Sequence, residues 1–206
     1  MLFRSGRVGS PFGAEHYGFK PDIMVVSKQL TSSYVPLAAV LFSEAMYSVV
    51  ADNTAKIGTF GHGFTTSGHP LAMAIALENL KIIEERDLMG NAARVGAVMQ
   101  AELAKLASHP LVGEVRGSGL IAGVELVEDK GSKRPFDPQL KVGARTFARG
   151  HDHGLIVRAI GDTIAICPPM IITEAQVQEV IRRLTQTLDD VATQLAADGQ
   201  LQKRYA

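Results

Sequence analysis

The stretch DIMVVSKQLTSSYVPLAAV, residues Asp22 to Val40, sets a single lysine between two apolar runs. The first run, Ile23–Val26, predicts a short strand that is buried on both faces. The second run, Val35–Phe42, predicts another strand. Lys28 therefore follows the carboxyl end of a strand, where the ligand sites of open α/β sheets are found. The alternative is a lysine that extends along apolar surface and keeps its ammonium group in water.

Composition and charge describe an ordinary globular protein. Of the 206 residues, 46% are hydrophobic and 20% charged, which is typical of one large or two small domains. The 21 basic residues balance the 21 acidic ones, so we expect neither nucleic acid nor a membrane as a partner. The only cysteine, Cys167, excludes an internal disulfide and any multi-cysteine metal site. With no secretory signal at the N-terminus, we expect a cytoplasmic protein without a metal centre.

The order of predicted elements divides the chain into two parts. Residues 1–86 contain the two strands and a helix that Pro70 opens, PLAMAIALENLKIIEER, which is apolar on most sides and is predicted to be buried. Two strands and one buried helix are too few to cover both faces of a sheet. We therefore interpret residues 1–86 as the remnant of a larger sheet-based domain, and residues 87–206 as a smaller α/β domain.

The second part carries clear helix and turn signals. Thr173 and Gln176 form a predicted capping box at the start of the last helix. The pair Gly161-Asp162 separates GLIVRAI from TIAICPP and predicts a turn between two strands. Further helices are expected over about 88–107 and 139–150, and one or two strands within 113–129.

Two further clusters are candidates for binding. The loop HGFTTSGHP, which runs from His62 to Pro70, places hydroxyls and glycines just before a helix, an arrangement that can hold a phosphate group. The alternative is an ordinary capped loop. Arg158, in the apolar strand GLIVRAI, can bind a carboxylate with two parallel hydrogen bonds or can form a surface ion pair. A lysine that is buried away from water, together with a phosphate-binding loop, is the combination that a pyridoxal phosphate enzyme needs.

At this point the sequence resembles a known family. The segments GRVGSPFGAEHYGFKPDIMVVSKQLTSSYVPLAAV, HGFTTSGHPLA, VGEVRGSGLIAGVELV and LIVRAIGDTIAICPP are similar, in the same order, to the C-terminal half of class III aminotransferases of the ω-amino acid or amine:pyruvate type. The resemblance implies an α/β fold of fold type I: the C-terminal part of the large cofactor-binding domain, followed by the small C-terminal α/β domain. It also implies pyridoxal 5'-phosphate as the cofactor, with an amine and a keto acid as substrates.

The resemblance assigns roles to four residues. Lys28 matches the lysine that forms the Schiff base and moves a proton between substrate and cofactor. Thr65, with Phe64 beside it, matches the threonine that reaches the cofactor phosphate of the neighbouring subunit, which implies a homodimer with shared sites. Arg158 matches the arginine that binds a substrate carboxylate.

The match has one large departure. Where the family has an apolar strand that ends in Asp-Glu-Val, this chain has MLFRSGR; Phe3 to Ser5 do not match, and only Gly6 and Arg7 do. We therefore expect the aspartate that pairs with the pyridine nitrogen to be missing from these 206 residues. Two alternatives to a transaminase remain: a catalytically silent fragment, or another reaction of the same cofactor, such as that of an aminomutase, racemase or decarboxylase.

Overall fold

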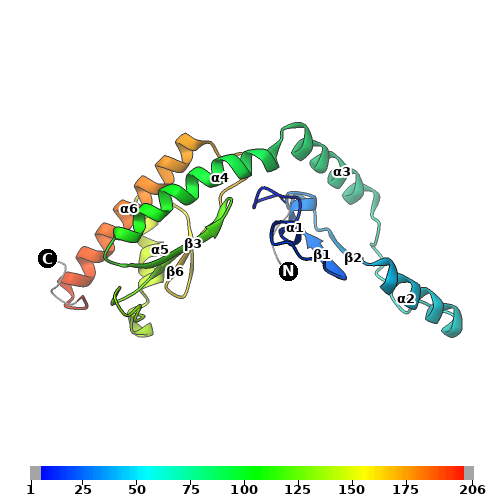
Figure 1. The fold of residues 1–206 in the computed structure, drawn as a ribbon, viewed down its shortest axis with the longest axis horizontal. Coiled ribbons are helices and arrows are strands. Elements are labelled where there is room, and N and C mark those ends of the chain that lie inside the picture. The colour runs from blue at the N-terminus through cyan, green and yellow to red at the C-terminus, as the bar shows by residue number, and fades with distance from the viewer. Residues whose placement is uncertain (1–5, 202–206) are drawn as a thin grey trace. The chain divides into compact units, whose positions relative to one another are not determined.

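The computed structural model describes residues 6–201 (Figure 1). Phe3 to Ser5, where the sequence departs from the family's pattern, lie outside the described residues. The chain separates into two compact units, the first ending at Gly90 and the second beginning at Asn91. The domain limits at residues 86 and 87 stay a prediction.

From residue 6 onward, the first unit is a strand pair with three α-helices. In chain order it holds α1 (Gly13–His16), β1 (Ile23–Ser27), a 3-10 turn (Lys28–Leu30), β2 (Ala38–Phe42), α2 (Glu44–Ile57) and α3 (Pro70–Glu85). β1 and β2 are antiparallel, with Val25 opposite Val40. The two strands and the helix opened by Pro70 are therefore confirmed.

The burial predicted for this unit is wrong. In β1, Ile23 is 52% exposed and Val25 is 49% exposed. On α3 only Ala72, Ala76 and Ile83 are buried, whereas several large apolar side chains on the same helix are exposed. The physical reason is that β1 and β2 form a two-stranded sheet, to which no third strand is joined within residues 6–201. Such a ribbon leaves apolar surface in water, and more strands or helices are needed to cover it.

As far as residue 201, the second unit has a four-stranded sheet and three α-helices (Figure 1). Its elements are α4 (Leu88–Lys105), β3 (Val112–Ser118), β4 (Ile121–Leu126), α5 (Val142–Asp152), β5 (Arg158–Ile160), β6 (Thr163–Ile166) and α6 (Glu174–Ala197), α4 starting just before the boundary. The strand order is β3-β4-β6-β5, and all neighbours are antiparallel. The predicted turn at Gly161-Asp162 is confirmed, because it joins β5 to β6.

One face of this sheet is the core of the unit. Along β4 and β6 every second side chain is buried, as the alternation of side chains in a strand requires. The helices bury stripes of apolar residues with helical spacing: Val95, Met99 and Leu103 on α4, and Val177, Leu184, Leu188, Val191 and Leu195 on α6. The capping box at the start of α6 is also confirmed, since Thr173 accepts from the backbone N–H of Gln176 and the Gln176 side chain accepts from that of Thr173. None of the helices within the described residues is long and apolar enough to cross a membrane.

The start of α5 packs unusually closely on the β5–β6 turn. A Cβ atom added to Gly143 would lie 2.0 Å from the backbone oxygen of Gly161, so only glycine fits there. The backbone N–H of Gly143 donates to the Asp162 carboxylate at 2.7 Å. Gly161 itself has φ +56°, the left-handed conformation that glycine adopts at little cost.

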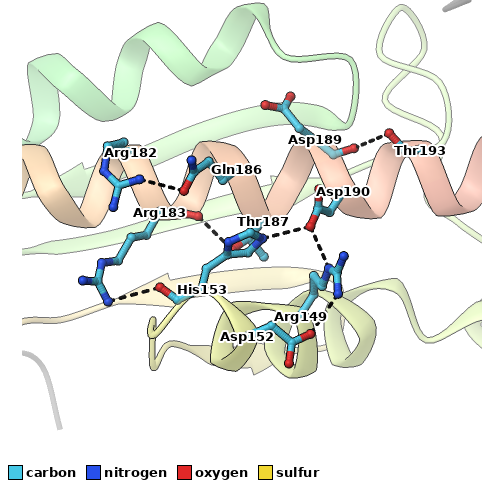
Figure 2. A network of polar contacts seen from close by, with 10 residues as sticks. All are labelled: Arg149, Asp152, His153, Arg182, Arg183, Gln186, Thr187, Asp189, Asp190 and Thr193. Carbon is cyan, nitrogen blue, oxygen red and sulfur yellow. Dashed lines mark hydrogen bonds and ion pairs between the residues drawn. The ribbon is translucent and has the colours of Figure 1, made fainter.

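Charged side chains join α5 to α6 (Figure 2). Arg149 donates to Asp190 at 2.8 Å and to Asp152 at 2.9 Å, and the His153 ring contacts Asp190 at 2.9 Å. Arg183 donates to the backbone oxygen of His153 at 3.1 Å. These contacts fix the C-terminal end of α5 against the middle of α6.

Candidate functional site

Lys28 lies in the 3-10 turn that directly follows β1, as the sequence predicted. Its backbone has φ +48°, a left-handed conformation that costs a residue with a Cβ atom about 1 kcal/mol. The sequence predicted that Lys28 is buried away from water, but within residues 6–201 its side chain is exposed. Its primary amine is therefore accessible to an aldehyde.

The loop after Lys28 is held by its own polar groups. The backbone oxygen of Lys28 accepts from the N–H groups of Thr31 at 3.2 Å and Ser33 at 3.0 Å. The buried hydroxyl of Thr31 donates to the backbone oxygen of Val35 at 2.7 Å, and that of Ser27 donates to Leu37 at 3.0 Å. The hydroxyl residues that surround the lysine in the sequence thus shape the turn that carries it.

One residue that sequence reasoning missed contacts the same loop. Asn79 of α3 donates from its amide nitrogen to the backbone oxygens of Gln29 at 2.6 Å and Leu30 at 3.2 Å. Its amide oxygen accepts from the Ser32 hydroxyl at 2.6 Å. The only signal in the sequence is an asparagine, a weak helix former, in the middle of an apolar helix.

Phe64 and Thr65 lie in the exposed loop between α2 and α3. The N–H of Ser67 donates to the Phe64 oxygen at 2.9 Å, so the loop turns just before α3. His69 occupies the N-cap position of α3, and among the described residues no side chain caps this helix. Uncapped N–H groups at a helix N-terminus, with Thr65 shortly before them in the sequence, suit a phosphate group.

Arg158 is the first residue of β5, so the predicted strand GLIVRAI is wrong for the residues that precede Arg158. β6 is only four residues long and pairs with residues 158–160, so the preceding apolar residues have no strand partner. Arg158 is exposed, and within residues 6–201 it forms no ion pair. The surface ion pair that was its alternative role is thus not formed with any residue that the structure describes.

Arg158 lines an open groove of about 730 Å³ in the second unit. Most of the wall is apolar, and it includes Ile156, Ile166, Pro169, Ile171 and Val180. Glu179 and Arg183 lie in the same wall. Hydrogen bonds from Arg182 and Arg183 lower the pKa of the Glu179 carboxyl to about 2. That carboxylate is therefore already paired, which leaves Arg158 as a cation available to an incoming anion.

The four predicted residues belong to different units. Lys28, Phe64 and Thr65 lie in the first unit, and Arg158 lies in the second. No hydrogen bond or ion pair between described residues joins any two of the four. A search of residues 6–201 finds no group of three or more histidine, cysteine, aspartate or glutamate side chains that could hold a metal ion.

Comparisons with known proteins agree on one family. A family model described as aminotransferase class-III matches residues 4–188. The diaminobutyrate–2-oxoglutarate transaminase of Halomonas elongata is 42% identical over 96% of this chain. Among solved structures, a transaminase with L-Ala is 53% identical over 93% of the chain with a TM-score of 0.90. The omega transaminase from Pseudomonas jessenii in complex with PMP is 47% identical over 94% of the chain, also with a TM-score of 0.90.

The chain spans less than half of these relatives. It covers 43% of the Halomonas enzyme and 45% of the transaminase with L-Ala. The structural match confirms the predicted fold class, an α/β fold of the type I pyridoxal phosphate-dependent transferases.

Proposed function

The chain belongs to the class III aminotransferases, which use pyridoxal phosphate, and we propose that it is part of a transaminase that moves an amino group from an amine or ω-amino acid to a keto acid such as pyruvate. The observation that carries the proposal is an accessible lysine amine on a hydrogen-bonded turn at the end of a strand. We further propose a homodimer that acts in the cytoplasm and shares its sites between subunits.

We assign each candidate residue of this chain a role that fits the chemistry of its side chain. When bound, pyridoxal phosphate supplies an aldehyde that condenses with amines and a ring that accepts electrons. Lys28 holds the cofactor through its Nζ atom, and its free amine carries a proton to and from the substrate. Phe64 and Thr65, in the loop that leads to the uncapped start of α3, would hold the phosphate of the partner subunit's cofactor. Arg158 binds the carboxylate of the keto acid, because a guanidinium group pairs with a carboxylate through two parallel hydrogen bonds.

The test is a covalent label. The 206-residue chain is incubated with pyridoxal phosphate and borohydride, and the labelled peptides are mapped by mass spectrometry. We expect the label on Lys28 in preference to Lys20, which is also an exposed lysine of the first unit. Lys28→Arg removes the label, whereas Lys20→Arg, the matched control, leaves it. Equal labelling of the two lysines would contradict the proposal.

The second candidate is a catalytically silent chain. It is favoured by the exposed apolar side chains of β1 and α3, which belong to the unit that carries Lys28. The two candidates predict different effects on Lys28 labelling when the upstream half of a relative is added. If Lys28 is labelled only after the upstream half of a relative is supplied, the chain alone is silent and the proposed function belongs to the longer assembly.

A further inference from the structure

The lysine loop is joined to a helix that lies far away in the sequence. Asn79 uses both ends of its amide: the nitrogen donates to Gln29 and Leu30, and the oxygen accepts from Ser32. These partners are 47 to 50 residues away along the chain. Three of the four positions that follow the lysine, Gln29, Leu30 and Ser32, are thus held by one side chain from outside the loop.

The loop needs such a contact because its backbone is unfavourable. Lys28, Ser32 and Ser33 all have positive φ values, of 48°, 48° and 65°. Each costs about 1 kcal/mol for a residue that has a Cβ atom. Such conformations persist only where the surrounding structure determines them. The hydrogen bonds within the loop hold its two ends, and those from Asn79 hold its middle against α3.

We propose that Asn79 is a positioning residue for Lys28: it fixes the backbone from which the lysine side chain departs. The chemistry requires an amide. Two backbone oxygens need an N–H donor, and the Ser32 hydroxyl needs an acceptor. Among side chains of the length of asparagine, only a neutral amide offers two N–H donors and an acceptor oxygen together. A carboxylate would set its oxygens against two carbonyl oxygens, and an alkyl side chain would leave those oxygens without this donor. The consequence for Lys28 rests on the proposed function, whereas the loop contact does not.

The first test measures the loop directly. Asn79→Asp keeps the size of the side chain but removes its donor, and Asn53→Asp is the matched control, since Asn53 donates only to Val49 of its own helix. Amide hydrogen exchange in a peptide covering residues 27–35 is expected to be about tenfold faster in Asn79→Asp and unchanged in Asn53→Asp. Unchanged exchange in both variants would overturn the proposal. Should Asn79→Asp fail to fold, Ser32→Ala, which removes one bond of the three, is expected to give a smaller increase in the same peptide.

The second test measures the lysine. The rate of borohydride-trapped labelling of Lys28 by pyridoxal phosphate is followed against pH in the same variants. We expect the labelling rate of Lys28 to be about tenfold lower across the pH range in Asn79→Asp alone, while Lys20 labels equally in all variants. Faster exchange with an unaltered Lys28 profile would reduce Asn79 to a purely structural residue and overturn its positioning role. If the wild-type chain does not label Lys28 even when the upstream half of a relative is supplied, the proposed function fails, and hydrogen exchange still decides whether Asn79 holds the loop.

Discussion

At the scale of single residues, the charges on α6 show how local pairing sets a pKa. Glu179 accepts hydrogen bonds from Arg182 and Arg183, each at 2.7 Å from its carboxylate. These bonds lower its pKa from 4.5 to about 2. The folded state therefore holds the ionised carboxylate more strongly than the unfolded chain does. Stability from this group is present in full above pH 4.5 and is lost as the pH falls toward 2.

Replacing this glutamate tests that relation. Glu179→Gln is expected to lower the melting temperature of the chain near neutral pH, and the difference from wild type is expected to shrink as the pH falls from 4.5 toward 2. Thermal unfolding followed by circular dichroism across this range measures it. Glu78→Gln is the control, because Glu78 forms no ion pair within residues 6–201 and its replacement should change little at any pH. A difference that stays constant over the whole range would refute the pairing.

At the scale of elements, the start of α6 depends on its capping box. Thr173→Ala removes the oxygen that accepts from the N–H of Gln176 at 3.2 Å. We expect the free energy of unfolding to fall by about 1 kcal/mol. Urea denaturation measures the change. Thr193→Ala is the control within the same helix, because the Thr193 hydroxyl donates only to the Asp189 oxygen one turn earlier. Equal losses in the two variants would show that the cap adds nothing.

Elements were predictable from the sequence where their signals are local. The cap at Thr173, the turn at Gly161-Asp162 and the helix opened by Pro70 each depend on residues within one turn, and all three are confirmed. Burial was not predictable for β1 and α3. Apolar residues indicate that a surface is covered in the functional protein, but they do not indicate whether the cover belongs to the same segment of chain.

The same distinction holds for the candidate site. Lys28, Phe64, Thr65 and Arg158 could be predicted because each belongs to a compact motif of the sequence. Asn79 was not found, because its partners lie 47 to 50 residues away and only the folded first unit brings them to its amide. Contacts of that separation leave no periodicity in the sequence.

At the scale of the whole molecule, the two units differ in how much core they have. α2 of the first unit has no buried residue, and the loop that follows it, residues 59–69, is exposed throughout. The second unit buries one face of its sheet and the apolar stripes of α4 and α6. Local opening is easiest where few apolar contacts are made, so we expect the first unit to open more readily.

Limited trypsin digestion tests this difference. The first cut is expected after Lys56, in the last turn of α2, and a fragment containing the whole second unit should then persist. Intact-mass measurement of the digest over time identifies the order of cuts. Lys56→Gln should delay the first cut without altering later ones. Early cleavage after Lys105, at the end of α4, would contradict the expected order.

The close contact at Gly143 has a consequence for how this fold can change over evolution. The atom that a Cβ at position 143 would meet is a backbone oxygen, which every amino acid at position 161 carries. No second substitution at that partner can therefore make room, and a larger residue at position 143 requires the β5–β6 turn itself to move. Most tight contacts in a core can be relieved by a smaller side chain at the neighbouring position. This contact cannot, because the neighbouring atom belongs to the backbone. Glycine at position 143 is therefore required by the backbone path of the β5–β6 turn, whichever residues form that turn.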